Sequence, residues 1–260
     1  YETKATYTAT VTASDGTNEA TQDLIVNVTD ANDVAPVFTS DAAFSVAENQ
    51  LSIGTVTATD EDSDSITFTV SGSELSITSG GLLSFVTAPD YETKATYTAT
   101  VTASDGTNST DQSITVSITN VNDNSPVFTS GSTFSAAENQ TSIGTVTATD
   151  ADASDSVTFT VSGSELSITS GGLLSFVTAP DYETKATYTA TVTASDGTNE
   201  ATQDLIVNVT DANDVAPVFT SDAAFSVAEN QLSIGTVTAT DEDSDSITFT
   251  VSGSELSITS

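Results

Sequence analysis

Carboxylate side chains make up most of the chemically capable groups of this sequence, and they recur in short fixed motifs. Over one stretch the motifs read AEN at Ala47, DED at Asp60, DYE at Asp90, ASDG at Ala103 and VNDNSP at Val121. The chain has no His and no Cys, so its metal-ligating groups are oxygens, the donors that hard cations prefer. The motifs therefore indicate oxygen-only cation sites and exclude thiolate and imidazole metal centres.

The charge balance narrows the possible functions. The 260 residues carry 37 Asp and Glu against three Lys, for a formal net charge of −34. A polyanion of this kind lacks the cations that neutralise nucleic-acid phosphates, and anionic membrane surfaces repel it. The carboxylates could serve solubility in a salty medium or hold cations, and their placement decides between these two readings.

Enzyme chemistry finds little support in the composition. His, Cys and Arg are all absent, and these residues supply many nucleophiles, general bases and anion clamps. The paired acids that could resemble a glycosidase couple recur with every repeat, so cation binding explains them better. We therefore expect no enzymatic activity.

An internal repeat organises the whole chain. Tyr1–Ser79 is identical to Tyr182–Ser260, and the segment YETKATYTATVTASDGTN also occurs at Tyr91, which gives units of 90 and 91 residues. The extra residue falls in one loop, where DEDSDS at Asp60 becomes DADASDS at Asp150. Two slightly different units thus alternate as a pair.

Prolines mark the expected borders between units. Residues 36–125 and 126–216 are predicted to be whole repeats, flanked by the C-terminal part of a repeat at 1–35 and the N-terminal part of another at 217–260. The links between units are too short for a flexible linker, so neighbouring repeats should touch head-to-tail. We expect the partial repeats to be completed by further residues of a longer array or by another chain.

Each unit is expected to form seven short strands between turn signals. In the first whole unit these are Val37–Val46, Ile53–Thr59, Ile66–Val70, a strand with Leu75 and Ile77, one through Leu83 and Phe85, Tyr97–Ala103, and one with Ile114, Val116 and Ile118. Apolar residues alternate with Thr and Ser, which buries one face of each strand. The sequence predicts an all-β chain of tandem seven-stranded, antiparallel Greek-key sandwiches of immunoglobulin-like shape in a linear array.

This topology should gather the acids at the two ends of each sandwich. At the border between the whole units, stacking would bring Glu48, Asp90, Glu92 and Asp123, with the Asn122 amide oxygen, against Asp150, Asp152 and Asp196. Carboxylates crowded in this way repel strongly unless a cation neutralises them. Calcium accepts six to eight oxygens in irregular geometry and suits such a site better than magnesium.

The motifs AEN, DxD, DYE, ASDG and DxNDxxP, in this order within each unit, resemble those of cadherin repeats. The resemblance covers the whole chain and implies about three calcium ions at each junction. For the other two junctions it implies as ligands Glu2, Asp30, Asn32 and Asp33 with Asp60, Asp62 and Asp105, and Glu138, Asp181, Glu183, Asp211, Asn213 and Asp214 with Asp241 and Asp243.

The sequence departs from the cadherin pattern in a few places. Val34 and Val215 replace the second linker Asn, and Asn120 replaces a leading Asp. After DxD, where the family often has Gly and Asn, this chain has Ser63–Asp64, so the resemblance does not supply a backbone ligand for the third calcium ion. The chain has no Trp, so the resemblance does not imply adhesion by exchange of a Trp-bearing strand.

Two functions of different classes remain open. The first is a stiff extracellular spacer, the calcium-rigidified stalk or fibre body of a bacterial surface adhesin; nearly identical units favour it. The second is a binding module, whose repeats pair with like chains or hold cell-surface polysaccharide in the presence of calcium. Both place the chain outside the cell or on its surface.

Overall fold

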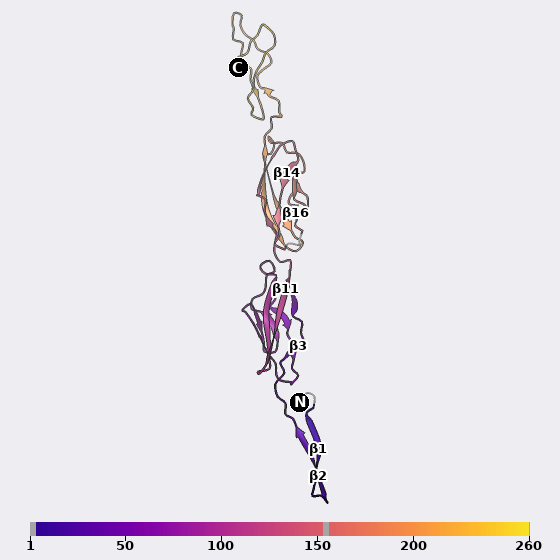
Figure 1. The fold of residues 1–260 in the computed structure, drawn as a ribbon. Helices are drawn as coiled ribbons and strands as arrows, with labels where there is room; N and C mark the ends of the chain where they lie inside the picture. Colours follow the sequence, from indigo (N-terminus) through magenta and orange to yellow (C-terminus); the bar gives the residue numbers. More distant parts are fainter. Residues whose placement is uncertain (1–3, 153–155, 260) are drawn as a thin grey trace. The chain divides into compact units, whose positions relative to one another are not determined.

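The computed structural model describes residues 4–152 and 156–259, and all the regular structure of these residues is β-strand. The chain forms two compact units, unit 1 (Tyr1–Val121) and unit 2 (Asn122–Ser260). Each unit contains one β-sandwich with its own core (Figure 1). Across the described part of the chain, no helix is long and apolar enough to cross a membrane.

Unit 1 begins with a hairpin. Strands β1 (Thr6–Ser14) and β2 (Glu19–Asn27) pair antiparallel over their whole length. The Asp15–Gly16 turn joins them, and Gly16 has a φ of 93°, a left-handed conformation that glycine adopts at little cost. Both strands are exposed along their length.

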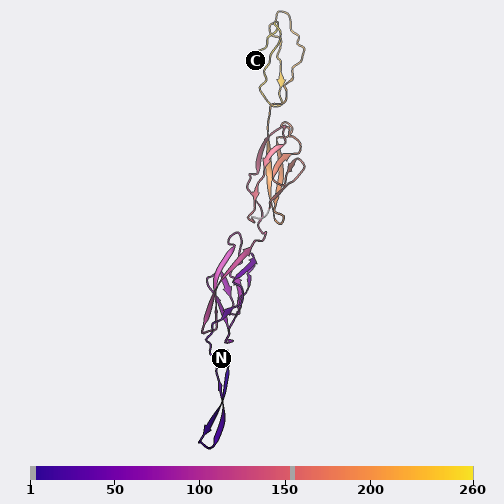
Figure 2. The same ribbon diagram turned by 45° about the vertical axis from the view of Figure 1, so that its right-hand side comes forward.

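Nine strands of unit 1 form its sandwich. A four-stranded sheet has the order β4 (Ala43–Ala47), β11 (Ser109–Thr119), β10 (Thr96–Ser104) and β7 (Thr67–Val70). A three-stranded sheet has the order β5 (Ser52–Thr55), β9 (Leu82–Phe85) and β8 (Leu75–Ile77), and β3 (Val37–Phe38) pairs with β6 (Ala58–Thr59). Figure 2 shows the strands of this sandwich turned by 45° from the first view.

Period-2 alternation builds this core as the sequence predicts. In β11, Ile114, Val116 and Ile118 are buried, whereas the Ser and Thr residues between them are exposed. Across the core, the Phe85 and Tyr97 rings meet edge to face with centroids 5.0 Å apart, a geometry that aromatic pairs prefer. The all-β sandwich architecture is therefore confirmed.

Two details of the predicted topology are wrong. The expected strands Val37–Val46 and Ile53–Thr59 each divide into two short strands, because the chain changes sheet within them. At the first crossing, the Thr39 and Ser40 N–H groups both donate to the Thr57 carbonyl (2.8 and 3.3 Å), which ends the β3–β6 ladder. After it, β4 joins the other sheet parallel to β11, so the strands are not all antiparallel. A strand that switches sheets turns a sandwich corner in this way.

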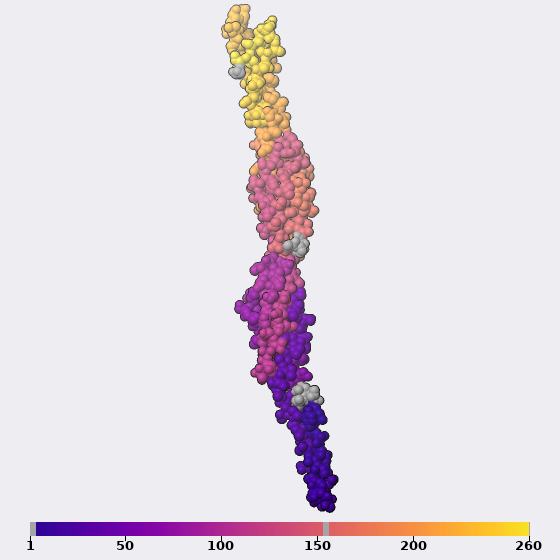
Figure 3. Space-filling model, viewed as in Figure 1, coloured from indigo at the N-terminus to yellow at the C-terminus, as the bar shows by residue number. Residues whose placement is uncertain are grey.

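Unit 2 repeats the same sandwich. Its strands are β12 (Val127–Phe128), β13 (Thr133–Ala137), β14 (Ser142–Thr145), β15 (Ala148–Thr149), β16 (Thr158–Val161), β17 (Leu166–Ile168), β18 (Leu173–Phe176), β19 (Thr187–Ser195) and β20 (Glu200–Thr210), in sheets of the same order. Among the described residues after Pro217, β21 (Val218–Phe219) and β22 (Ala239–Thr240) form a further short pair. Side chains cover the face of each sandwich that is seen in the space-filling view (Figure 3).

The Gly-Gly turn before β9 is required by a close backbone approach. Gly81 has a φ of 87°, and a Cβ atom there would lie 2.2 Å from the Val56 carbonyl oxygen. The Gly81 carbonyl in turn accepts a hydrogen bond from the Val56 N–H (2.9 Å). Gly172 makes the same approach to Val146 in unit 2.

Adjacent leucines provide a test of this packing. Leu83 and Leu174 are fully buried, whereas Leu82 and Leu173 are about half exposed. We expect Leu83→Ala with Leu174→Ala to destabilise each sandwich by about 2–5 kcal/mol, because each change removes apolar burial and leaves a cavity. The control, Leu82→Ala with Leu173→Ala, should change stability by less than about 0.5 kcal/mol. Urea unfolding measures both, and equal losses in the two double variants would contradict the assigned strand faces.

Candidate metal centre

The second Asp of each DxD motif fixes the backbone of the preceding linker. Asp62 is 7% exposed, and its Oδ2 accepts hydrogen bonds from the N–H groups of Asp33 (2.9 Å) and Val34 (2.8 Å). The loop after β6 orients it, because the Asp62 N–H donates to Asp60 Oδ1 (2.9 Å). A buried carboxylate with two N–H donors thus attaches the linker to the sandwich that follows.

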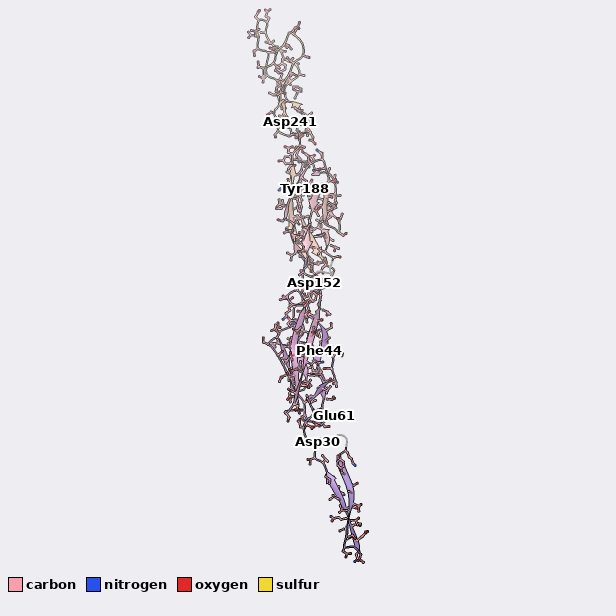
Figure 4. The ribbon with its side chains drawn as sticks, in the orientation of Figure 1. Asp30, Phe44, Glu61, Asp152, Tyr188 and Asp241 are labelled. Carbon is pink, nitrogen blue, oxygen red and sulfur yellow. The ribbon has the colours of Figure 1, made fainter. Side chains whose placement is uncertain are left out.

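The same attachment recurs in unit 2. Asp243 Oδ2 accepts from the N–H groups of Asp214 (3.0 Å) and Val215 (2.8 Å). Asp152, fully buried, accepts from the N–H groups of Asp123 (3.2 Å) and Asn124 (2.9 Å). Figure 4 labels Asp152 and Asp241 in unit 2, and Asp30 of the linker and Glu61 of the loop after β6 in unit 1.

The Glu of AEN has the matching role at the other end of each sandwich. Glu138 is 4% exposed, and its two carboxylate oxygens accept from the Tyr182 N–H and the Ala212 N–H, each at 2.7 Å. Glu48 binds the Tyr91 and Val121 N–H groups in the same way. One carboxylate therefore joins the DYE loop to the chain that leaves the last strand.

The Asp of ASDG forms its own turn. In Asp105, Oδ1 accepts from the N–H groups of Thr107 (2.7 Å) and Asn108 (2.6 Å). Desolvation raises the pKa of this carboxyl, but these hydrogen bonds outweigh it, and the pKa is lowered overall. Asp196 has the same partners in its own turn, and its pKa is lowered for the same reasons.

The Asn of the same turn contacts the linker, which the sequence reasoning missed. Asn108 Nδ2 donates to Asn32 Oδ1 (2.9 Å), and Asn199 Nδ2 donates to Asn122 Oδ1 (2.7 Å). The signal was present in the sequence, because the motif DGTN recurs with a polar fourth residue at Asn18, Asn108 and Asn199.

Several of the predicted ligands lie together. Carboxylate oxygens within 4.8 Å of one another occur in the group Glu138, Asp181 and Glu183 and in the group Glu183, Asp211 and Asp243. Two further groups, Asp60, Asp62 and Asp64 and Asp241, Asp243 and Asp245, include Asp64 and Asp245, which were not predicted as ligands. The predicted gathering of DYE, linker and DxD acids is thus present in unit 2.

Other predicted residues lie nearby without joining these groups. Among the described residues, no such group of either unit contains Asp30, Asp33, Asp90, Asp105, Asp150, Asp152, Asp196 or Asp214. Asp90, for example, accepts hydrogen bonds from the Thr93 N–H and hydroxyl. Of the residues expected between the two whole repeats, Glu48 and Glu92 lie in unit 1, whereas Asn122 and Asp123 lie in unit 2. Glu2 is outside the described residues.

The lysines do not neutralise these carboxylates, because each is engaged elsewhere. Lys94 Nζ lies 2.5 Å from Glu74 Oε1 and 4.4 Å from the centroid of the Tyr97 ring. Lys185 has the same arrangement with Glu165 and Tyr188, and Lys4 lies over the Tyr7 ring at 4.6 Å.

Unpartnered buried oxygens show that the donor set fits a hard cation. Asp60 Oδ2, Asp62 Oδ1, Asp150 Oδ2, Glu183 Oε1 and Asp243 Oδ1 are buried without a hydrogen-bond partner among the described residues. A buried, uncompensated carboxylate is costly, and calcium accepts six to eight such oxygens. In unit 2, Glu138, Asp181, Glu183 and Asp214 line an open cavity of about 270 Å³. The residues present therefore suit calcium in number, type and spacing.

Repulsion within the acidic groups of unit 2 is visible in the carboxyl pKa values. Desolvation raises the pKa of Asp211, and the carboxylates of Asp243, Glu138 and Asp245 raise it further. A hydrogen bond from its own N–H lowers the pKa of Glu183, but desolvation and the carboxylates of Glu138, Asp243 and Asp211 outweigh this effect and raise it overall. A nearby cation would reverse both shifts.

Comparison with known protein families and curated proteins places these features in context. The model of a bacterial Ig domain matches residues 32–119. Mouse Cadherin EGF LAG seven-pass G-type receptor 2 is 33% identical over 279 residues, which cover 94% of this chain and 10% of that protein. Drosophila melanogaster protocadherin-like wing polarity protein stan is 35% identical over 246 residues, which cover 81% of this chain and 7% of that protein. The chain thus spans about a tenth or less of these relatives.

Solved structures agree with this likeness. The protocadherin GammaB4 extracellular domain matches 93% of this chain and 43% of its own with a TM-score of 0.73 at 28% identity. The structure of mouse cadherin-23 EC22–24 matches 81% of this chain and 78% of its own, with a TM-score of 0.66 and 25% sequence identity. A protocadherin gammaB7 EC3–6 cis-dimer structure matches 85% of this chain and 62% of its own, also with a TM-score of 0.66 and 25% sequence identity. All three are structures of cadherins or protocadherins, in agreement with the expectation of a chain without enzymatic activity.

The two glutamates of the first acidic group in unit 2 should respond differently to substitution in metal-free protein. Glu138→Ala leaves the Tyr182 and Ala212 N–H groups without their partner and should destabilise unit 2 by about 1–3 kcal/mol. Glu183→Gln removes a charge whose Oε1 has no partner among the described residues, so stability should stay the same or rise. Thermal unfolding in chelator measures both, and a loss with Glu183→Gln equal to that with Glu138→Ala would contradict this division of roles.

The raised pKa values of Asp211 and Glu183 predict a pH dependence of the metal-free protein. Because the folded chain holds these protons more tightly than the unfolded chain, stability is present at low pH and is lost as pH rises through the raised values. We expect the melting temperature in chelator to fall as pH rises from about 4 to 7, and Asp211→Asn to weaken this fall. The control Asp196→Asn, at a group with a lowered pKa, should leave the fall in place. A melting temperature that rises over this interval in chelator would refute the assignment.

Proposed function

Since the chain is a tandem array of cadherin-like repeats of the kind found in extracellular adhesion proteins, we propose that it is a stiff spacer whose repeats are fixed to one another by calcium. One observation carries the proposal. Asp62 and Asp243 each use one buried oxygen to hold the preceding linker, and the other buried oxygen has no partner among the described residues. A cation at that oxygen would link the same side chain to the acids around it.

The proposed ligands are the residues predicted from the sequence. At the junction within unit 2, Glu138, Asp181 and Glu183 come from the sandwich, Asp211, Asn213 and Asp214 from the linker, and Asp241 and Asp243 from the loop that follows. Bound calcium would supply the positive charge that the group lacks. The chain itself holds the ligand oxygens in place. Glu138 accepts from the N–H groups of the DYE loop and of the start of the linker, and Asp243 accepts from the N–H groups at the end of the linker.

The same proposal extends to the other two junctions. There Asp30, Asn32 and Asp33 are assigned with Asp60 and Asp62 of the loop after β6 and with Asp105 of the turn after β10. At the remaining junction, Glu48, Asp90, Glu92, Asn122 and Asp123 are assigned with Asp150, Asp152 and Asp196. We place the repeat borders at Pro36, Pro126 and Pro217, so that residues 36–125 and 126–216 are whole repeats.

A structural role in a bacterial surface adhesin or filament suits the chain better than recognition does. Residues 1–79 and 182–260 are identical, and a spacer requires only length and stiffness, so nothing selects for different surfaces. The match of residues 32–119 to a bacterial Ig domain supports a bacterial source. In this proposal the calcium-loaded array carries another part of the protein away from the cell surface.

Pairing with like chains is the second candidate, and one observation favours it. The outward faces of β11 and β20 differ, since Ser113, Thr115 and Ser117 correspond to Asp204, Ile206 and Asn208, and Ile206 is 44% exposed. Sedimentation analysis of the chain in calcium separates the candidates, because a spacer stays monomeric at micromolar concentration, whereas a homophilic module associates.

Calcium removal tests the proposed function directly. At a calcium concentration roughly 100-fold above the dissociation constant, each occupied site adds about 2.7 kcal/mol to stability, so the melting temperature should rise clearly above its value in chelator. Magnesium at equal concentration should have a smaller effect, because it requires near-octahedral geometry. An identical melting temperature in calcium and in chelator would overturn the proposal.

A further inference from the structure

A third acid follows each of two DxD motifs and joins the same group of oxygens. Asp60, Asp62 and Asp64 each offer a carboxylate oxygen within 4.8 Å of the other two, and so do Asp241, Asp243 and Asp245. All three residues of a group belong to one short loop of one sandwich. No linker residue is needed to bring them together.

In Asp60 and Asp62, the first two aspartates of the loop, one carboxylate oxygen accepts hydrogen bonds and the other accepts none from the described residues. Asp60 Oδ1 accepts from the N–H groups of Asp62 (2.9 Å) and Asp64 (3.4 Å), and Asp62 Oδ2 accepts from the linker. Asp60 Oδ2 and Asp62 Oδ1 are buried and have no hydrogen-bond partner among the described residues. Since Asp62 is 7% exposed, its second oxygen is an unpaired acceptor held away from water.

The loop backbone brings the third carboxylate to this point. Ser63 has a φ of 65°, and its N–H donates to the Asp60 carbonyl (3.3 Å), which turns the chain back on itself. Ser244 has a φ of 62° and makes the same bond to Asp241 (3.4 Å). A non-glycine residue in this region costs free energy, and the turn holds like charges together that would otherwise separate.

We propose that Asp64 and Asp245 are direct ligands of a cation held within their own loop, which makes it a three-carboxylate site. This inference rests on the proposed calcium binding and adds a ligand that the cadherin pattern does not supply. At this place the pattern offers Gly and Asn, and the additional carboxylate raises the negative charge of the site. More ligand charge tightens calcium binding.

The other repeat type has one more residue in the corresponding loop, where DADASDS at Asp150 replaces DEDSDS at Asp60. There the third acid follows the first Asp by five positions (Asp150, Asp155) in place of four (Asp60, Asp64). Asp155 lies outside the described residues, so the proposal concerns the repeats that carry Asp64 and Asp245.

The experiment compares two double variants of the whole chain that carry the same change in charge. Asp64→Ala with Asp245→Ala removes the third carboxylate of both loops. The control, Glu61→Ala with Glu255→Ala, removes two exposed acids that belong to none of the described carboxylate groups. Calcium titration by calorimetry gives the affinities, and the lifetimes of bound Eu³⁺ luminescence in H₂O and D₂O give the number of coordinated waters. Melting in chelator checks that all the proteins are folded.

The outcomes separate the inference from the proposed function. Loss of a direct ligand should weaken calcium binding at two sites by on the order of tenfold and add about one coordinated water at each, with the control unchanged. Unchanged hydration and affinity in Asp64→Ala with Asp245→Ala overturn the inference and leave calcium binding in place. Equal weakening in both variants assigns the effect to overall charge and also overturns it. If the unsubstituted chain binds neither Ca²⁺ nor Eu³⁺, the proposed function fails as well.

Discussion

The packing of carboxylates at the ends of the strands is the constraint on which the rest of the structure depends. Glu48, Glu138, Asp62, Asp152 and Asp243 are all nearly or fully buried, although burial of an ionised carboxylate is among the most costly changes in folding. Each offsets part of this cost with two backbone N–H donors, and in every case those donors belong to a linker or to the loop beside it. The hydrogen bonds that compensate the buried carboxylates therefore also fix the backbone of the linkers.

The sandwich supplies the rigid frame for these carboxylates. Strict alternation of apolar residues with Thr and Ser gives each repeat a core that needs neither disulfides nor large aromatic clusters. The acids lie in loops at the strand ends, where they do not disturb the alternation. Each of the three lysines is engaged with a glutamate or an aromatic ring near it, so no lysine side chain of the described residues neutralises the linker carboxylates. Under the proposed function, the missing positive charge would come from cations of the medium.

The sequence allowed most of this architecture to be predicted, and the misses have physical reasons. Alternation identifies which residues of β10 and β11 are buried because it depends only on local geometry. It cannot show that β3 and β4 lie in different sheets, since the crossing at Thr39 and Ser40 is set by long-range pairing with Thr57. The acids of the DYE, linker and DxD motifs come together as predicted in unit 2, whereas Asp64 escaped notice because its approach depends on the left-handed turn at Ser63. Asn108 was missed for a similar reason, as its partner lies 76 residues away in the chain.

The parallel pairing of β4 with β11 has a mechanical consequence. Only the short β3 precedes β4 in the sandwich, and β11 is its last strand. Because β4 and β11 are parallel, a pull on the two ends of a repeat draws these neighbouring strands in opposite directions along their length. Their ladder from Thr115 and Ala43 to Thr119 and Ala47 is then loaded in shear, and its hydrogen bonds bear the force together. A hairpin pulled from its open end, by contrast, opens one bond at a time. The two sandwiches, in which β13 and β20 are paired in the same way, are thus built to resist tension along the chain.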